Sequence, residues 1–353
     1  MNASISLGSG KLDALRSFAV CLVLLSHLPI SATISNLVFG EVNFHLQAVG
    51  LLGVAIFFVH TCLVLMMSLE RQSARQGEAH LALIFLVRRA FRIYPLSIAT
   101  VLILAALGWS AAGSRHAYVG IISNILLIQN ITGHPSNPPA LWSLPFEVQM
   151  YLVLPFVFLY VTAQGTRAVS AVLLIWFASA ALVLVVWALG WDYQLIKYFP
   201  TFLPGVMAYS LQGRKPSLPA TILVAYLALI VAIYPVLVAR GVSEGALLWP
   251  ICLALGVLIA CSKEMIDGPV RAIVGQIAKY SYGIYLVHGP MIDFSFIHLK
   301  GHSVVFQWAS FVMGTVLLSY VAFHLIEKPG IDIGTRLSNA MGRSRINARV
   351  REG

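Results

Sequence analysis

The chain has 353 residues, of which 59% are hydrophobic and only 10% are charged, and its mean hydropathy is +0.86. A soluble domain carries about a quarter charged residues, so this composition excludes an ordinary water-soluble protein and predicts an integral membrane protein. The formal charge of +10 would favour nucleic-acid binding in a soluble protein. Here the basic residues lie between apolar stretches, so we assign the charge to membrane topology and anionic lipid and predict no nucleic-acid partner.

The first ten residues are polar and uncharged, which is not the pattern of a signal peptide, and residues 1–11 are interpreted as a short tail. Ten apolar stretches follow, and each is predicted to span the membrane, because a span needs about 20 mostly apolar residues. They are Leu12–Ile30, Val49–Leu69, Ile93–Ala111, Pro145–Val161, Ala168–Leu189, Tyr198–Leu211, Leu218–Val238, Leu247–Cys261, Tyr280–Leu299 and Val304–Ile326. Tyr118–Ile131 is apolar but too short, and is predicted to be interfacial or re-entrant.

The basic residues fix the predicted orientation, because lysine and arginine concentrate on the cytoplasmic side of membrane proteins. With ten spans and both termini cytoplasmic, only four of the 23 basic residues lie outside: Arg115, Lys197, Arg240 and Lys300. The predicted fold class is therefore an all-α polytopic membrane protein of about ten transmembrane helices. Its transmembrane domain is expected over residues 12–327, and residues 328–353 are expected to form a basic cytoplasmic tail.

The first predicted span carries three ionisable side chains, and a charge inside a bilayer costs several kcal/mol, so each is a functional hypothesis. Arg16 and His27 are eleven residues apart, which returns to nearly the same helix face about 16 Å further along the axis. Asp13 lies three residues before Arg16 and can pair with it. The alternative is that Asp13 and Arg16 anchor the helix end while His27 caps a backbone carbonyl.

Two further groups of charged residues enter later spans. Arg88, Arg89 and Arg92 precede the third span from the cytoplasmic side, where guanidinium groups can hold phosphate oxygens or simply anchor the helix. Glu147 opens a helix on the outer side, where its carboxylate can stabilise the helix dipole or orient an acceptor hydroxyl.

The weaker candidates are His288, His324 and Glu327. The last two are three residues apart and can bind each other. For His60, helix packing is the favoured role. No HxxH, HExxH, GxSxG or glycine-rich phosphate motif occurs, so the sequence predicts no metal site.

Five ordered segments carry a resemblance to a known family: LDALRSFAVCLVLLSH, RRAFRIYP, LWSLPFEVQMYLVLP, YSYGIYLVH and HLIEKPGIDIGTRL. Their order resembles that of membrane acyltransferase family 3, over essentially the whole chain. The resemblance implies transfer of an acyl group, usually acetyl from acetyl-CoA, to a sugar hydroxyl of a surface or secreted glycan. It also implies a stand-alone member without an SGNH domain, in a bacterial cytoplasmic (inner) membrane. Many members have FFVLSGFL where this chain has FFVHTCLV, which removes a glycine from a helix interface.

The resemblance also assigns roles to residues by position. The family's recognised motifs are matched by Arg16, His27, Arg89, Arg92 and Glu147, and recurrent positions of less defined role by Asp13, His288 and Glu327. Acyl-CoA is then expected as the donor substrate with no other cofactor, its phosphates held by Arg89 and Arg92 with Arg88.

His27 is expected to act as general base and Arg16 to stabilise the oxyanion, with Asp13 fixing the Arg16 fork. Glu147 would position the carbohydrate or glycolipid acceptor. The competing hypotheses are a transporter or flippase of glycan intermediates, in which the charged residues form a polar pathway, and a scaffold subunit of a glycan-assembly complex.

Overall fold

The computed structural model describes residues 9–28, 40–78, 80–109, 117–191, 194, 196–212, 217–264 and 268–352. Residues 1–8 of the predicted tail, and Arg115, Arg214 and Lys215 of the charge pattern, lie outside these ranges. The described chain contains helices and no strand beyond one isolated bridge between Leu218 and Ser262, so the all-α prediction is confirmed.

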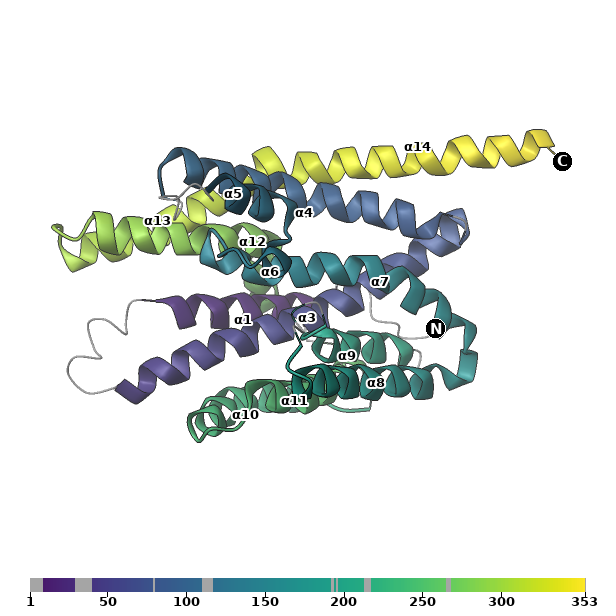
Figure 1. Ribbon diagram of the computed structural model, residues 1–353, viewed down its shortest axis with the longest axis horizontal. Helices are drawn as coiled ribbons and strands as arrows, with labels where there is room; N and C mark the ends of the chain where they lie inside the picture. Colours follow the sequence, from purple (N-terminus) through teal and green to yellow (C-terminus); the bar gives the residue numbers. More distant parts are fainter. Residues whose placement is uncertain are drawn as a thin grey trace.

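The helices form a layered bundle (Figure 1). The α-helices are α1 (Gly10–His27), α3 (Gly40–Gln76), α4 (Leu81–Ala106), α5 (Ala117–Leu126), α6 (Gln129–Thr132), α7 (Leu144–Ala163), α8 (Ala168–Ala188), α9 (Phe199–Ser210), α10 (Ala220–Ala239), α11 (Glu244–Cys261), α12 (Pro269–Ile292), α13 (Val304–Ala322) and α14 (Lys328–Glu352). Two short 3-10 helices, η1 (Pro139–Ser143) and η2 (Gly165–Arg167), and two π-helical segments, η3 (Asp293–His298) and η4 (Phe323–Glu327), complete the set.

Within the described residues, seven helical stretches are long and apolar enough to cross a membrane, which makes the chain a multi-pass membrane protein. The count of ten remains a prediction. Of the other predicted spans, the α1 region carries Lys11, Asp13 and Arg16 within its 18 residues. Helix α9, predicted as a span, has only 12 residues, about 18 Å of rise, which cannot cross a hydrocarbon core about 30 Å thick.

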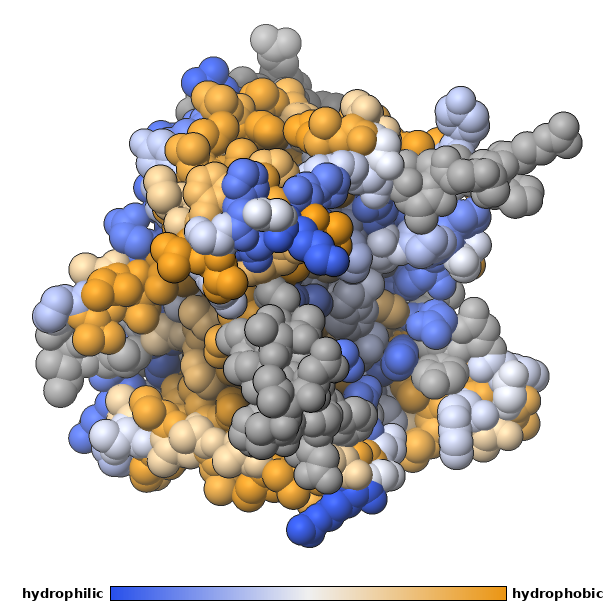
Figure 2. Space-filling view, turned by 90° about the vertical axis from the view of Figure 1, so that its left-hand side faces the viewer, coloured by the Kyte–Doolittle hydropathy of each residue, from blue (hydrophilic) through white to orange (hydrophobic). Residues whose placement is uncertain are grey.

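Apolar side chains cover the outside of the bundle as well as its interior. Large hydrophobic residues are exposed along α8 and α13, among them Leu174, Phe177, Trp187, Met313 and Val316. Figure 2 shows one end of the bundle, with hydrophobic residues over much of its periphery and hydrophilic residues nearer its middle. Apolar patches of this extent are costly in water, so these faces are the surfaces that lipid covers.

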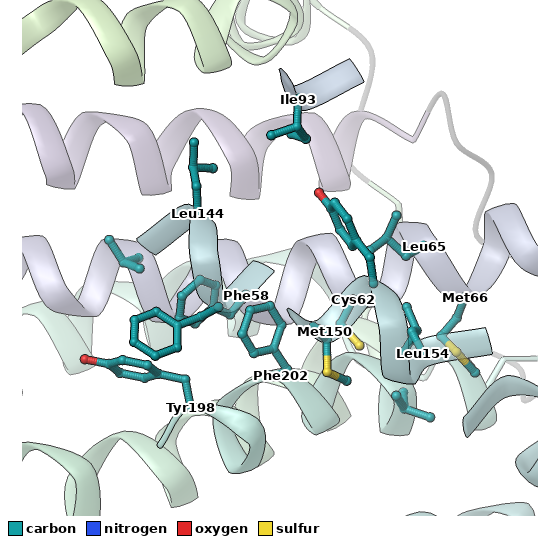
Figure 3. Close-up of a cluster of buried hydrophobic side chains, with 14 of the residues drawn as sticks. Phe58, Cys62, Leu65, Met66, Ile93, Leu144, Met150, Leu154, Tyr198 and Phe202 are labelled. Carbon is teal, nitrogen blue, oxygen red and sulfur yellow. The ribbon is translucent and has the colours of Figure 1, made fainter. Parts of the chain in front are cut away.

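Helix α3 runs through the centre of the bundle and separates two clusters of buried hydrophobic residues. One cluster joins α3 to α4, α7 and α9, and the other joins it to α1, α10 and α11. In the first, the Phe58 and Phe202 rings stack with their centroids 4.0 Å apart, and Tyr198 packs edge-on against Phe58 (Figure 3). This core fixes the central part of α3, which carries one wall of the site described below.

Glycines allow the helices around α3 to approach closely, as is common in membrane bundles. A Cβ at Gly53 would lie 2.8 Å from the backbone oxygen of Ala19 on α1. A Cβ at Gly205 on α9 would lie 2.6 Å from the Cβ of Cys62 on α3. Position 62, where many members have glycine, therefore faces a glycine on α9.

The beginning of α1 is held by buried polar contacts rather than left as a free tail. The helix starts at Gly10, so Lys11 belongs to it, and this side chain is only 2% exposed. Its Nζ donates to the backbone oxygens of Ile259 and Ser262, both at 2.7 Å. A cation at the carbonyl end of α11 is favourable for the helix dipole, so Lys11 joins the start of α1 to the end of α11.

The segment Tyr118–Ile131, predicted to be too short for a span, forms the short helices α5 and α6. Helix α5 has 10 residues, too few for a span. The Tyr94 hydroxyl in the middle of α4 donates to the backbone oxygen of Leu126 at 3.2 Å, which places the end of α5 beside the middle of α4. Asn124 then receives a hydrogen bond from the Asn137 backbone and tethers the following loop.

The last helix continues well past the predicted end of the final span at Ile326. Helix α13, η4 and α14 follow one another without interruption, and α14 extends beyond the bundle (Figure 1). Its first turns pack on α4, where a Cβ at Gly330 would lie 2.6 Å from the backbone oxygen of Phe91. The segment predicted as a basic tail therefore begins as a packed helix.

We expect Gly205→Ala to destabilise the protein by about 1–3 kcal/mol, because the added methyl group would overlap α3 backbone that cannot move aside. Thermal unfolding in detergent measures the loss. Gly245→Ala is the matched control, since nothing lies within 4 Å of a Cβ at Gly245. Equal melting temperatures for the two variants would show that the α3–α9 contact is loose.

Candidate active site

A cavity of about 290 Å³ lies between α1, α3, α4, α7 and α12. Its apolar wall comes largely from α3, including Phe57 and Phe58. Its polar wall is formed by Arg16, His60, Arg89, Arg92, Glu147, Tyr151, Ser281 and Tyr285. We call this space the central cavity. Its volume is close to the lower end of small-ligand sites, and polar groups from several helices converge on it.

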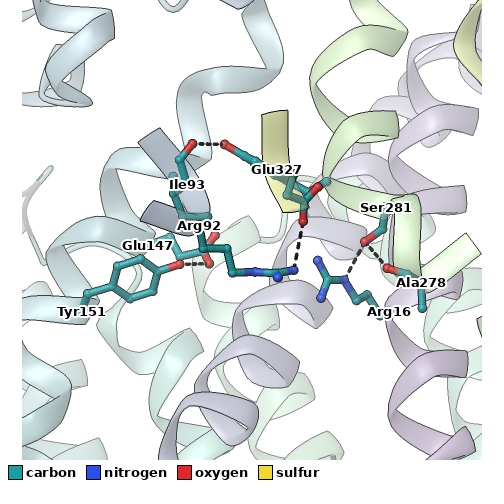
Figure 4. Close-up of polar contacts among 9 residues, drawn as sticks. Arg16, Arg92, Ile93, Glu147, Tyr151, Ala278, Ser281 and Glu327 are labelled. Carbon is teal, nitrogen blue, oxygen red and sulfur yellow. Dashed lines mark hydrogen bonds and ion pairs between the residues drawn. The ribbon is translucent and has the colours of Figure 1, made fainter. Parts of the chain in front are cut away.

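Arg16 reaches the central cavity from α1 and is oriented by α12. Its Nε donates to the Ser281 hydroxyl at 2.6 Å, and that hydroxyl donates in turn to the backbone oxygen of Ala278 at 2.8 Å. The Arg16 guanidinium points toward that of Arg92 (Figure 4). The fork of Arg16 is thus fixed by Ser281, whereas the sequence had predicted that Asp13 would fix it.

Arg92 is paired with the carboxylate of Glu327. One Arg92 terminal nitrogen lies 3.4 Å from Glu327 Oε1, and the Glu327 side chain is fully buried (Figure 4). Glu327 belongs to the π-helical segment η4, and π-helical turns are frequent at functional sites. The alternative pairing of His324 with Glu327 is not found, because His324 lies against Tyr280 and Tyr320 instead.

Glu147 is held in the first turn of α7 by the residue one turn later. The Tyr151 hydroxyl donates a hydrogen bond to Glu147 Oε1. Arg89 lies over the Phe85 ring, 5.7 Å from its centroid, and its Nε is buried without a hydrogen-bond partner among the described residues. Arg89 and Glu147 therefore face the same space from α4 and α7.

The charges around the central cavity do not cancel. Three guanidinium groups, those of Arg16, Arg89 and Arg92, lie near two carboxylates, Glu147 and Glu327. Buried charges of one sign are costly unless opposite charge is close by. The excess positive charge favours a ligand that carries or develops negative charge, such as the oxyanion formed when a carbonyl is attacked.

His27 and His288 form a pair of imidazoles next to the central cavity and do not line it. Their ring centroids are 5.1 Å apart in an edge-on arrangement. His27 is exposed, whereas His288 is fully buried. Tyr285 adjoins both the pair and the cavity, because its ring is 6.0 Å from that of His288 and it also lines the cavity, where its hydroxyl shares a hydrogen bond with Ser143 at 2.7 Å.

The hydrogen bonds of the two imidazoles define their tautomers. Nδ1 of His27 lies 2.8 Å from the backbone oxygen of Val23, and Nδ1 of His288 lies 3.2 Å from that of Ile284. A carbonyl oxygen can only accept, so Nδ1 carries the proton in each neutral ring and Nε2 keeps its lone pair. His27 caps a carbonyl, as the alternative interpretation predicted, and still offers Nε2 as a base.

Two sequence candidates lie away from the central cavity. Asp13 is half-buried near Gly275 of α12 and makes no ion pair with Arg16 in the part of the chain that is described. Arg88 turns toward α14, where its Nε donates to the Ser338 hydroxyl at 2.7 Å and a terminal nitrogen donates to the Asn339 side chain at 2.8 Å. Among the described residues, no three His, Cys, Asp or Glu side chains lie together in a group that could hold a metal ion.

A sequence model of the family described as the acyltransferase domain, Acyl_transf_3, matches residues 9–324. The chain belongs to this acyltransferase family. The match begins at the cap of α1 and ends in η4, so it includes every residue that lines the central cavity. Glu327, the partner of Arg92, follows three residues later.

Two curated members of related sequence carry names that describe their activity. "Putative peptidoglycan O-acetyltransferase YrhL" of Bacillus subtilis is 27% identical over 90% of this chain and 54% of its own length, so this chain spans about half of that relative. "Acyltransferase MdmB" of Streptomyces mycarofaciens is 24% identical over 89% of this chain and 87% of its own length. No solved structure matches the chain.

The sequence analysis did not single out several side chains of the central cavity. Three of these residues, Tyr151, Ser281 and Tyr285, are uncharged, so they do not stand out in an apolar span as a charged residue does. Their spacing along the helices could have indicated them. Tyr151 is four residues after Glu147, and Ser281 is four before Tyr285, so each pair shares a helix face. His60 was interpreted as a packing residue; it is 5% exposed and lines the cavity.

Proposed function

We propose that this membrane acyltransferase moves an acyl group, acetyl in the simplest case, from acyl-CoA to a hydroxyl of a glycan or glycolipid. The observation that carries the proposal is the convergence of Arg16, Arg89, Arg92 and Glu147 on one cavity beside an imidazole with a free Nε2. The name of YrhL supports a glycan hydroxyl as acceptor and acetyl as the transferred group.

In the proposed reaction the donor occupies the central cavity with its thioester at the Tyr285 wall, the side on which the His27–His288 pair lies. The acceptor hydroxyl approaches from the side of His27. Nε2 of His27 removes the hydroxyl proton as the oxygen attacks the thioester carbonyl. The negative charge that develops on the carbonyl oxygen is stabilised by Arg16, which Ser281 holds in position. The carbon–sulfur bond then breaks, and the CoA thiolate takes the proton from the His27 imidazolium.

Glu147 and the remaining arginines have distinct proposed tasks. Glu147, oriented by Tyr151, accepts a hydrogen bond from a second hydroxyl of the acceptor and so selects its position. Arg89 and Arg92 bind the donor from the α4 side of the cavity. The thioester is already activated, so the reaction needs no cofactor beyond acyl-CoA.

The test is transfer of label from acetyl-CoA to a glycan by purified protein in liposomes. Peptidoglycan fragments are the first acceptors to use, followed by other surface glycans and lipid-linked sugars. Formation of a labelled O-acetyl ester that hydroxylamine removes supports the proposal. Movement of a glycan across the liposome membrane without ester formation would instead identify a transporter.

We expect Arg89→Ala to raise the KM for acyl-CoA by about tenfold, more than the KM for acceptor, because a buried charge-assisted contact to the donor is lost. Steady-state rates with each substrate varied in turn measure the effect. Arg167→Ala removes an exposed arginine at the end of η2, just before α8, and is expected to change neither KM. A larger change in the KM for acceptor would move Arg89 away from the donor.

A further inference from the structure

A second cavity, of about 210 Å³, lies where α3 ends and α4 begins. It is lined by Ser68, Arg71, Gln72 and Arg75 of α3 and by Arg88 of α4, and we call it the arginine cavity. Arg71 and Arg75 are four residues apart and share one face of α3. This end of the bundle is the one from which α14 extends (Figure 1).

The arginine cavity has positive charge without a carboxylate in its lining. Arg88 is held by neutral partners only, the side chains of Ser338 and Asn339. The carboxylate next to Arg71 along the chain, Glu70, hydrogen-bonds to Tyr209 on α9. Three guanidinium groups at one opening repel one another, so their arrangement favours a bound anion that bridges them.

A buried amide provides a second, independent sign of a ligand. Gln72 is 3% exposed, and its Nε2 donates to the Ser68 hydroxyl at 2.9 Å. Its Oε1 is buried without a partner among the described residues. Because a hydroxyl can donate as well as accept, Ser68 can bond either end of the amide, and Gln72 can then offer its N–H group to an anion.

The arginine cavity and the central cavity follow one another along the same two helices. Leu65 of α3 lines the central cavity, and Ser68, about 4.5 Å further along the axis, lines the arginine cavity. Arg89 faces the first, and its neighbour Arg88 faces the second. A ligand long enough to reach both cavities would have its reactive end among Arg16, Arg89 and Glu147 and its charged end beside Arg71.

We propose that the arginine cavity binds phosphate, and that this phosphate belongs to the nucleotide end of the acyl-CoA donor. Arg71, Arg75 and Arg88 hold its oxygens, while the acyl end extends into the central cavity. The inference rests on the proposed function for the identity of the donor. It assigns the phosphates to Arg71 and Arg75, which the sequence did not single out, and leaves Arg89 and Arg92 to the acyl end.

The experiment measures binding of CoA, 3′-dephospho-CoA and adenosine 3′,5′-bisphosphate to the full chain in nanodiscs of zwitterionic lipid. Wild-type protein is expected to prefer CoA to 3′-dephospho-CoA and to bind the bisphosphate. Arg71→Gln/Arg75→Gln is expected to weaken CoA binding about tenfold or more and to remove the preference. Arg71→Lys/Arg75→Lys keeps the charge that sets topology and should show an intermediate loss.

Arg336→Gln is the matched control, because it removes an exposed arginine from α14 outside the cavity. Unchanged CoA affinity in both double variants would overturn the assignment. A second series in nanodiscs with phosphatidylglycerol tests a lipid headgroup as the source of the phosphate. If the double variants lose only the retention of anionic lipid and bind CoA normally, the donor assignment also fails.

The binding assay separates this inference from the proposed function. Loss of preference for the 3′-phosphate in the double variants supports the arginine cavity even where no glycan accepts an acyl group. If acyl transfer is normal and CoA affinity does not depend on Arg71 and Arg75, the arginine cavity does not bind the donor phosphate. The proposed function is then unaffected.

Discussion

His27→Ala is expected to lower kcat for acyl transfer by about 10²–10⁴-fold, the range that a positioned general base contributes. His27 is the exposed member of the two imidazoles, and its Nδ1 is bonded to the Val23 carbonyl. Its Nε2 therefore has a free lone pair that can accept a proton. Since the side chain is exposed, its removal leaves no large internal void. Label transfer from acetyl-CoA at saturating donor and acceptor measures the change.

His302→Ala is the control for His27→Ala, because it removes an exposed histidine outside the central cavity. We expect that control to keep its activity. A purely structural role for His27, as a cap of the Val23 carbonyl, predicts a lower melting temperature with a nearly normal kcat. That result would remove His27 from the role of base.

Breaking the Arg92–Glu327 pair is expected to have the largest effect on stability. The Glu327 carboxylate is fully buried, and it loses its ion-pair partner once Arg92 is gone. Arg92→Met should therefore cost about 3–5 kcal/mol of unfolding free energy, as for other buried pairs that lose one partner. Thermal or denaturant unfolding in detergent measures the loss.

The double variant Arg92→Met/Glu327→Met separates folding from activity. Replacing both members of a buried pair by apolar side chains of similar size is often neutral or stabilising, so we expect stability to recover. We expect activity not to recover, because the central cavity has lost a guanidinium that we propose binds the donor. Full activity in a stable double variant would show that Arg92 has only a structural role.

Several features of the site follow from local rules and were predictable. Arg16 and Glu147 stand out because charge within an apolar span is costly, and both reach the central cavity. The segment around Tyr118 could be recognised as too short to span, and α5 is short. The bounds of α9 were predicted to within one residue at each end, but its assignment as a span was wrong, because a buried short helix has the same composition as a span.

The sequence by itself determined that the chain is a helical membrane protein, and which side chains are too polar to face lipid without a reason. Composition and helical spacing are properties of a single segment, so they can be determined from its sequence without knowing which segments pack against it. Tertiary structure alone decided the partners: Glu327 for Arg92, Ser281 for Arg16, and His288 for His27. Arg16 and His27 share a stripe of α1 but lie about 16 Å apart along it, so different helices face them. Which helix faces α1 at each of these two positions depends on packing between segments distant in the chain. No local sequence pattern determines that packing.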